Sequence, residues 1–303
     1  MQPLKGKVAV VAGATRGAGR GIARMLGEAG ATVYCTGRSS RSAPVERPEG
    51  VSPFDLRGRP ETIEETAELV NAHGGTGIAL RVDHSDERQV AGLFARVRAE
   101  QGRLDLLVND VWGGDDLVEW GRPFWELSVE KGLLMQQRAV FTHIITSRHG
   151  APLLVERGQG LIIEITDGDT PKYRGNLFYD LVKSSAIRLA YAMAEELRPH
   201  GVAALALTPG FLRSEAMLEH FGVTEANWRD GAQKDPHFIA SETPFFVGRA
   251  VAALAADPQI MRKSGGAYSS WGLSEEYGFT DQDGSRPHWG RYYAEHLVGA
   301  GGS

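Results

Sequence analysis

Short apolar runs alternate with longer stretches of helical periodicity from the N-terminus to Gly210. Each run is bounded by turn-forming residues and is nearly all apolar, which is typical of a strand covered on both faces. We therefore predict strands at Lys7–Gly13, Ala31–Gly37, Thr76–Asp83, Leu104–Asp110, Gly160–Thr166 and Val202–Gly210.

The segments between these runs carry the helical pattern. We predict helices at Gly17–Ala29, Thr62–His73, Glu87–Gln101, Lys131–Glu156 and Tyr179–Arg198. Strand–helix alternation of this kind indicates an α/β protein with a doubly wound parallel sheet and helices on both faces. Because the sequence has no repeat and no linker-like break, we expect residues 1–303 to form a single domain.

Three segments fall outside this alternation. The polar connection Ser39–Pro60 is expected to be a surface loop near a ligand. Residues 211–245 are expected to form a variable pocket segment, and residues 271–303 a C-terminal extension. The final stretch Gly299–Ser303 is expected to be a frayed tail.

Composition narrows the class of protein. The 303 residues are 42% hydrophobic and 23% charged, with a net charge of -5, which gives no reason to expect nucleic acid or an anionic membrane as partner. Cys35 is the single cysteine, so an internal disulfide is excluded and a reducing cytoplasm is the expected compartment. No apolar run approaches the roughly 18 residues of a membrane span, and we expect no targeting segment.

Glycines are concentrated where the first strand leads into the first helix. Gly13, Gly17 and Gly19 have the spacing GxxxGxG, with Thr15 and Arg16 inside the loop. In nucleotide-binding βαβ units such glycines let the backbone approach a pyrophosphate, whose charge lies at the helix N-terminus. A tight loop in any α/β protein is the alternative explanation.

The end of the second strand indicates which dinucleotide would bind. NAD-binding enzymes place an acid there to hold the ribose hydroxyls, whereas this chain has Gly37 and Arg38. A guanidinium matches a phosphate with paired hydrogen bonds, so we predict NADP(H) in preference to NAD, with Arg16 on the same side. The alternative is that Arg38 and Arg41 are solvated loop charges.

The sequence YDLVK places Tyr179 and Lys183 four residues apart, and hence on one face of a predicted helix. A tyrosine and a lysine at this spacing also occur by chance. Taken together, GxxxGxG, the Asn–Asp pair ending the fourth strand, YxxxK and PGFLRS resemble the short-chain dehydrogenase/reductase (SDR) family. The stretches ALAADPQI and TDQDGSRP further resemble its dehydrogenase/reductase member 1 branch.

This resemblance implies a Rossmann-type fold and a role for each matching residue. Tyr179 would exchange a proton with the substrate oxygen, and Lys183 would lower the pKa of that tyrosine and hold the nicotinamide ribose. Further cofactor contacts are implied at Asp83, Asn109, Pro209, Gly210 and Ser214.

The sequence departs from the family pattern at two places, a serine pair and a helix asparagine. Thr166 and Asp167 stand where the family has a serine pair, of which one member hydrogen-bonds the substrate oxygen. Thr166 offers a similar hydroxyl, whereas an ionised Asp167 would raise the pKa of the tyrosine unless it turned away or kept a proton. The helix asparagine of the family is replaced by Ala139.

We therefore predict an NADP(H)-dependent oxidoreductase acting on a carbonyl or alcohol of a small organic substrate. The alternatives are an NADP(H)-binding protein with little turnover and a regulatory role, or a lyase or epimerase on the same scaffold. By resemblance we expect a homodimer or homotetramer. The scattered histidines lack ligand spacing and predict no metal site. Aromatic candidates for the substrate pocket are Trp112, Phe178, Phe211 and Trp228.

Overall fold

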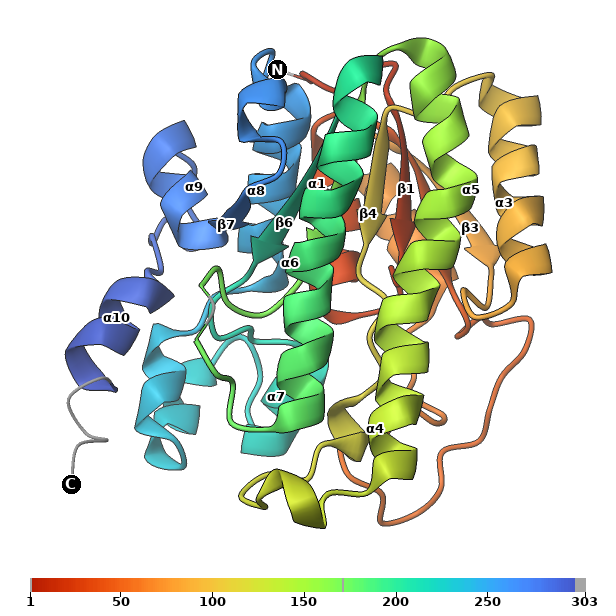
Figure 1. Cartoon of the computed structure of the whole chain (residues 1–303). Helices are drawn as coiled ribbons and strands as arrows, with labels where there is room; N and C mark the ends of the chain where they lie inside the picture. Colours follow the sequence, from red (N-terminus) through yellow and green to blue (C-terminus); the bar gives the residue numbers. More distant parts are fainter. Residues whose placement is uncertain (1, 171, 298–303) are drawn as a thin grey trace.

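The computed structural model describes residues 2–170 and 172–297, which form one α/β domain (Figure 1). Within these residues, seven parallel strands lie in the order β3-β2-β1-β4-β5-β6-β7. The strands are β1 (Val8–Ala12), β2 (Thr32–Gly37), β3 (Thr76–Arg81), β4 (Leu106–Asn109), β5 (Gly160–Ile165), β6 (Val202–Thr208) and β7 (Ala267–Ser269). The predicted doubly wound parallel sheet is confirmed.

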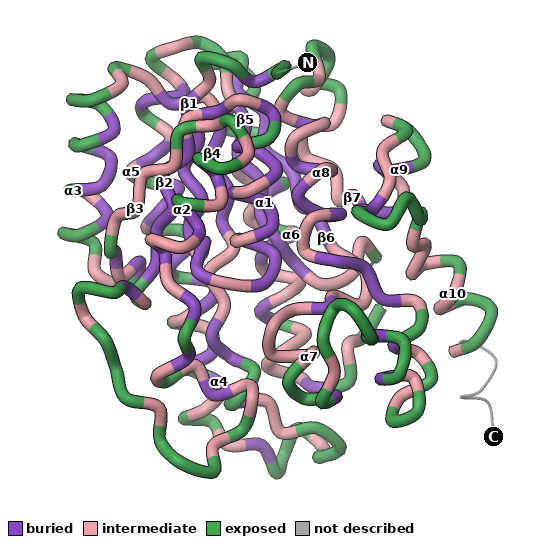
Figure 2. Tube along the Cα trace, turned by 180° about the vertical axis from the view of Figure 1, so that it is seen from behind, coloured by how far each residue is buried: buried purple, intermediate pink, exposed green. Residues whose placement is uncertain are grey.

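Helices cover both faces of the sheet, as predicted. One face carries α1 (Gly17–Glu28), α2 (Ile63–Ala72) and α8 (Pro244–Ala256). The other carries α3 (Glu87–Gln101), α5 (Thr142–Arg157) and α6 (Leu177–Leu197). Figure 2 shows buried residues concentrated in the strands between these two layers. The remaining helices are α4 (Val129–Gln136), α7 (Glu215–Phe221), α9 (Ser270–Tyr277) and α10 (Trp289–His296).

The predicted helix Lys131–Glu156 is longer and less regular than its pattern indicated. A π-helical turn at Gln137–Phe141 joins α4 to α5, so helical backbone continues from Val129 to Arg157. Such turns commonly occur near functional sites. This one contains Ala139, which borders a small cavity described below.

Several elements lie beyond the predicted set. The strand β7 is only three residues long, which is too short to show a period of two. Helix α8 packs closely on α1, because a Cβ on Gly21 would overlap the backbone of Pro244. The expected tail Gly299–Ser303 lies outside the described residues.

Candidate active site

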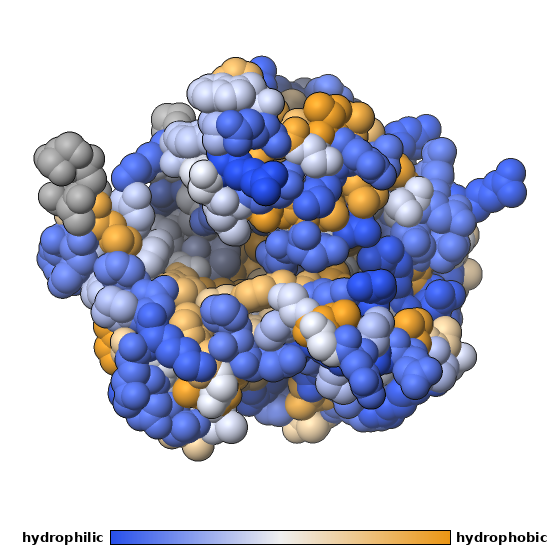
Figure 3. Space-filling model, turned by 90° about the horizontal axis from the view of Figure 1, so that it is seen from below, coloured by the Kyte–Doolittle hydropathy of each residue, from blue (hydrophilic) through white to orange (hydrophobic). Residues whose placement is uncertain are grey.

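A cleft of about 1410 Å³ lies at the carboxyl edge of the sheet. Figure 3 views the molecule from this side and shows the hollow, with apolar side chains along its lower wall. In open α/β sheets, ligands bind outside the carboxyl ends of the strands where the strand order reverses. Here the reversal lies between β1 and β4, so the cleft is where a dinucleotide is expected.

The glycine loop brings backbone to one end of this cleft. Gly13 has a φ of +89°, and a Cβ there would lie 2.5 Å from the carbonyl oxygen of Asp110. A Cβ on Gly19 would overlap the carbonyl of Gly13. These two positions therefore require glycine, and the loop lies against both β4 and α1. Gly13, Thr15 and Gly17 line the cleft, whereas Gly19 supports them from behind.

Helix α1 begins at this loop, and no side chain from its N-cap or first turn caps its first backbone amides. Its N-cap residue Arg16 makes no side-chain capping bond, and its first turn contains no acid. By contrast, α2 begins with a capping box formed by Thr62 and Glu65. The backbone amides at a helix N-terminus attract anions, so this end of the cleft fits a pyrophosphate.

Arg38 and Arg16 both line the cleft near the end of β2, where the adenosine of a dinucleotide is expected. They differ in exposure and in hydrogen bonding. The Arg38 side chain is 55% exposed and lies 4.0 Å from Asp83. Arg16 donates to Glu61 at 3.2 Å and to the hydroxyl of Ser39 at 3.1 Å. Arg38 is therefore the guanidinium with more freedom to meet a phosphate. The exposed Arg41 pairs with Glu68 instead.

Tyr179 and Asp167 form a hydrogen-bonded pair at the opposite end. Asn176 caps the N-terminus of α6 and accepts the backbone N–H of Tyr179. The Tyr179 hydroxyl donates to Oδ2 of Asp167 at 2.8 Å. Burial, together with the Asp167 carboxylate, raises the pKa of Tyr179 well above its usual value. The Thr166 hydroxyl donates instead to the carbonyl of Lys183 at 2.7 Å, so Asp167 is the residue that faces the phenol.

Lys183 lies one helical turn after Tyr179, as its spacing predicts. Its Nζ is 4.0 Å from the centre of the Trp112 ring and 5.4 Å from that of Tyr179. Burial lowers the pKa of this lysine and raises the pKa of the neighbouring Asp110 to about 7. Behind it, Ala139 borders a cavity of about 30 Å³, which is room for one water.

Aromatic rings border the same end. Trp112 and Trp120 both meet the Tyr179 ring edge to face, with centroids 5.6 and 5.2 Å away. Phe211 also lines the cleft, as the sequence suggested for it and Trp112. Two other aromatic candidates lie elsewhere. Trp228 is buried in a cluster with Phe221 and Phe238, and Phe178 packs on Gly132.

The loop after β6 brings Pro209, Gly210 and Ser214 to the cleft. The Gly210 N–H donates at 2.9 Å to Glu242, a buried acid whose pKa is raised by burial to about 8. Ser214 caps α7 through its hydroxyl. This loop is therefore held in place by the N-terminus of α7 and by Glu242.

One residue with an implied cofactor contact has its side chain outside the cleft. Asn109 is fully buried and donates to Ser147 and Glu164, so its amide lies in the core behind the cleft. Asp110, the next residue, lines the cleft in its place, because successive side chains of a strand point to opposite faces. Asp83 lies where expected, although its carboxylate accepts bonds from Ser85.

Several residues of the cleft wall were not predicted, namely Asp110, Asp115, Glu215 and Arg59. Nor were the buried acids Glu242 and Glu61, which bond to the wall residues Gly210 and Arg59. Asp110 belongs to the Asn–Asp pair noted above, but the other residues stand in no motif, so no local signal distinguishes them from surface acids and bases. Among the described residues, no group of three or more histidine, cysteine, aspartate or glutamate side chains is arranged to hold a metal. Within the same residues, no helix combines the length and apolar character needed to span a membrane.

Comparison with known proteins identifies the family of this chain. Residues 48–222 match the family model described as short chain dehydrogenase, and the chain belongs to the short-chain dehydrogenase/reductase family. It is 36% identical over 287 residues to Dehydrogenase/reductase SDR family member 1 of Mus musculus, covering 93% of this chain and 85% of that protein. The Homo sapiens protein of the same name gives the same values, so the resemblance to this branch is confirmed.

More distant proteins share the architecture. Oxidoreductase UcpA of Escherichia coli strain K12 is 25% identical over 273 residues, covering 85% of this chain and 90% of that protein. A short chain dehydrogenase of Mycobacterium thermoresistibile has a TM-score of 0.75 at 23% identity, covering 95% of this chain and 92% of the other. A metagenomic short-chain oxidoreductase, solved in complex with NADP, has a TM-score of 0.61 at 24% identity, covering 84% and 92%.

Proposed function

We propose that this protein is an NADP(H)-dependent oxidoreductase that interconverts a carbonyl and an alcohol on a small organic substrate. The observation that carries the proposal is one cleft that brings the glycine loop together with Tyr179 and Lys183. Family membership supports oxidoreductase chemistry in general. When bound, the nicotinamide would supply or accept the hydride at the substrate carbon.

The preference for NADP(H) rests on the adenosine end of the cleft. Arg38 is exposed there, its nearest acid is 4.0 Å away, and the position usually held by a ribose-binding acid is Gly37. The NADP complex of the metagenomic relative is consistent with this preference. Gly17 at the start of α1 and the loop at Gly210 would hold the remainder of the dinucleotide.

Proton transfer is assigned to Tyr179. Its raised pKa keeps the phenol protonated at neutral pH, which suits donation to a carbonyl oxygen during reduction. The substrate oxygen would replace Asp167 as acceptor of the hydroxyl, and Lys183 would stabilise the phenolate left behind.

The charges at this end favour neutral substrates over anionic ones. Asp115, Asp116 and Asp167 all line the cleft. Arg138 also lines it, but its guanidinium lies 3.5 Å from Asp116 and donates to the carbonyl of Gly113. With Lys183, the cleft wall here has two cations against these three acids, which disfavours a substrate carboxylate, while Trp112 and Phe211 offer apolar contact.

The test measures NADPH oxidation with paired neutral and carboxylate-bearing aldehydes and ketones, for the native protein and Tyr179→Phe. We expect turnover of neutral carbonyls that falls by about 100-fold or more in the variant, because the proton donor is lost. NADPH binding should be unchanged. Equal rates for the two proteins would overturn the role of Tyr179.

The same experiment separates the alternatives. The bond from Tyr179 to Asp167 is the observation that favours a cofactor-binding protein with little turnover, since it occupies the phenol. NADPH binding without turnover of any carbonyl would support that alternative. Product formation without net NADPH consumption would instead support a lyase or epimerase.

A homo-oligomer and a cytoplasmic location remain part of the proposal. Support for the oligomer comes from large apolar side chains exposed on neighbouring helices. These are Val129 and Leu133 on α4, Phe141 in the π-helical turn, Ile144 on α5, and Leu181 and Tyr191 on α6. Sedimentation would give the number of subunits.

A further inference from the structure

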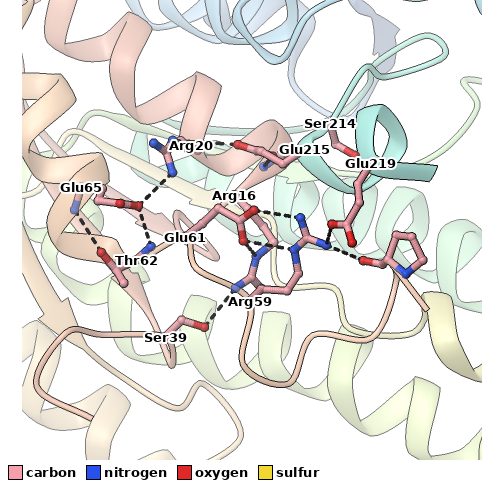
Figure 4. Close-up of polar contacts among 12 residues, drawn as sticks. Arg16, Arg20, Ser39, Arg59, Glu61, Thr62, Glu65, Ser214, Glu215 and Glu219 are labelled. Atoms are coloured by element: carbon pink, nitrogen blue, oxygen red, sulfur yellow. Dashed lines mark hydrogen bonds and ion pairs between the residues drawn. The ribbon is translucent and has the colours of Figure 1, made fainter. Parts of the chain in front are cut away.

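The amide that opens helix α1 already holds an anion from the chain itself. The N–H of Gly17 donates to Oε2 of Glu215 at 2.8 Å, although the two residues are 198 positions apart. Glu215 is the first residue of α7, and its side chain is 30% exposed in the cleft (Figure 4). A carboxylate thus lies where the fold would place a phosphate.

The surroundings of Glu215 complement its charge. Nε of Arg20 lies 3.9 Å from the other oxygen of Glu215 and 22% of its side chain is exposed. The helix N-terminus contributes a partial positive charge from the same direction. Because a backbone N–H has one hydrogen to donate, Gly17 cannot fully serve this carboxylate and a phosphate at once.

Helix α7 is fixed at a second point, one turn further on. Glu219 accepts from Arg59 at 2.8 Å and from Arg47 at 3.2 Å. The Arg59 side chain is only 2% exposed and also pairs with Glu61. Both arginines come from the connection after β2, so α7 is tied across the cleft to both the glycine loop and this connection (Figure 4).

We propose that Glu215 is an internal competitor of the cofactor phosphates. Its carboxylate occupies the Gly17 amide until a dinucleotide displaces it, so Glu215 sets the affinity of the cleft for phosphate-bearing ligands. This inference rests on the proposed dinucleotide function.

Two variants separate the hydrogen bond between Glu215 and Gly17 from the charge of Glu215. Glu215→Gln removes the charge, whereas Glu215→Asp keeps it but is one methylene too short to reach Gly17 while Glu219 holds α7 in place. The control is Glu46→Gln, which makes the same charge change in the connection after β2 at an exposed residue. Thermal unfolding of each variant checks that it is folded.

Dissociation constants are measured for NADPH, inorganic pyrophosphate and adenosine. We expect both Glu215 variants to bind NADPH and pyrophosphate about tenfold more tightly than the native protein, as expected for loss of a competing charged hydrogen bond. Adenosine, which has no phosphate, should bind all four proteins alike. Glu46→Gln should match the native protein.

Three results would overturn the inference. Tighter binding by Glu215→Gln alone would mean that the charge acts through space without competing for the amide. Equal NADPH affinity in all four proteins would show that Glu215 does not compete with the cofactor phosphates, while leaving the proposed function intact. Failure of the native protein to bind any nicotinamide dinucleotide would overturn the proposed function and this inference together.

Discussion

The two ends of the cleft are held by different kinds of group. At the glycine loop the chain presents backbone, and neighbouring main chain lies so close to Gly13 and Gly19 that neither position has room for a side chain. At Tyr179 it presents side chains, whose hydroxyl and carboxylate are hydrogen-bonded to each other at 2.8 Å. The geometry of the glycine loop therefore depends on the absence of side chains, whereas the hydrogen bond at Tyr179 depends on which groups carry a proton.

This difference has a consequence for how each end responds to change. A backbone site keeps its shape after most changes in charge nearby, but an added methyl group disrupts it. A side-chain site keeps its shape after an isosteric substitution, but its proton affinity shifts. The following substitutions test this contrast, in order of decreasing expected effect.

Gly13→Ala should have the largest effect. Its Cβ would lie 2.5 Å from the carbonyl oxygen of Asp110, at a φ of +89° that disfavours side chains. We expect a loss of about 2–3 kcal/mol in unfolding free energy and NADPH binding weaker by more than about tenfold. Chemical denaturation and NADPH fluorescence titration measure the two quantities. Gly102→Ala is the control, since it has a φ of +66° with open space around it, and a similar loss there would contradict the role of close approach.

Arg38→Leu tests the side chain expected to contact the 2′-phosphate of NADP(H). Loss of a paired guanidinium–phosphate contact should weaken NADPH binding by about tenfold or more and leave NADH binding unchanged. Comparing both dissociation constants checks this. Arg41→Leu, at an arginine already paired with Glu68, should change neither constant. An equal loss for NADPH and NADH would place Arg38 outside the phosphate site.

Asp167→Ser should alter chemistry without altering binding. The Asp167 carboxylate helps to raise the pKa of Tyr179, so its removal lowers that pKa and makes phenolate available at lower pH. The pH profile of alcohol oxidation should move down by about one unit, with a rate near neutral pH about tenfold higher. Asp169→Ser, two residues further on, is the control. An unmoved profile would show that Asp167 does not govern the phenol.

Glu242→Gln should have the smallest effect, on stability alone. The pKa of this buried acid is about 8, above its value in an unfolded chain, so the native protein binds the extra proton. Stability therefore falls as pH rises from the ordinary glutamate range toward 8, and the amide removes this loss. We expect the Tm of the variant to exceed that of the native protein by about 2–4 °C near pH 9 and to approach it near pH 5. A parallel pH dependence would contradict the raised pKa.

Local patterns were sufficient for most of the sheet and helices. The strands β1 to β6 are apolar runs that the sequence displays directly, and the YxxxK spacing predicts the relation of Tyr179 to Lys183. Local patterns failed where an element is short, as at β7, or where strand alternation decides which side chain faces the cleft. Asn109 and Asp110 are adjacent, yet one is in the core and the other in the cleft.

The sequence by itself determined the strand–helix order, the glycine loop and the phenol–ammonium pair, because each depends on residues within a few positions of one another. Only the tertiary structure decided that Asp167 rather than Thr166 meets Tyr179, and that Glu215 meets Gly17. Those contacts depend on side-chain direction and on segments up to 198 positions apart, which packing alone brings together.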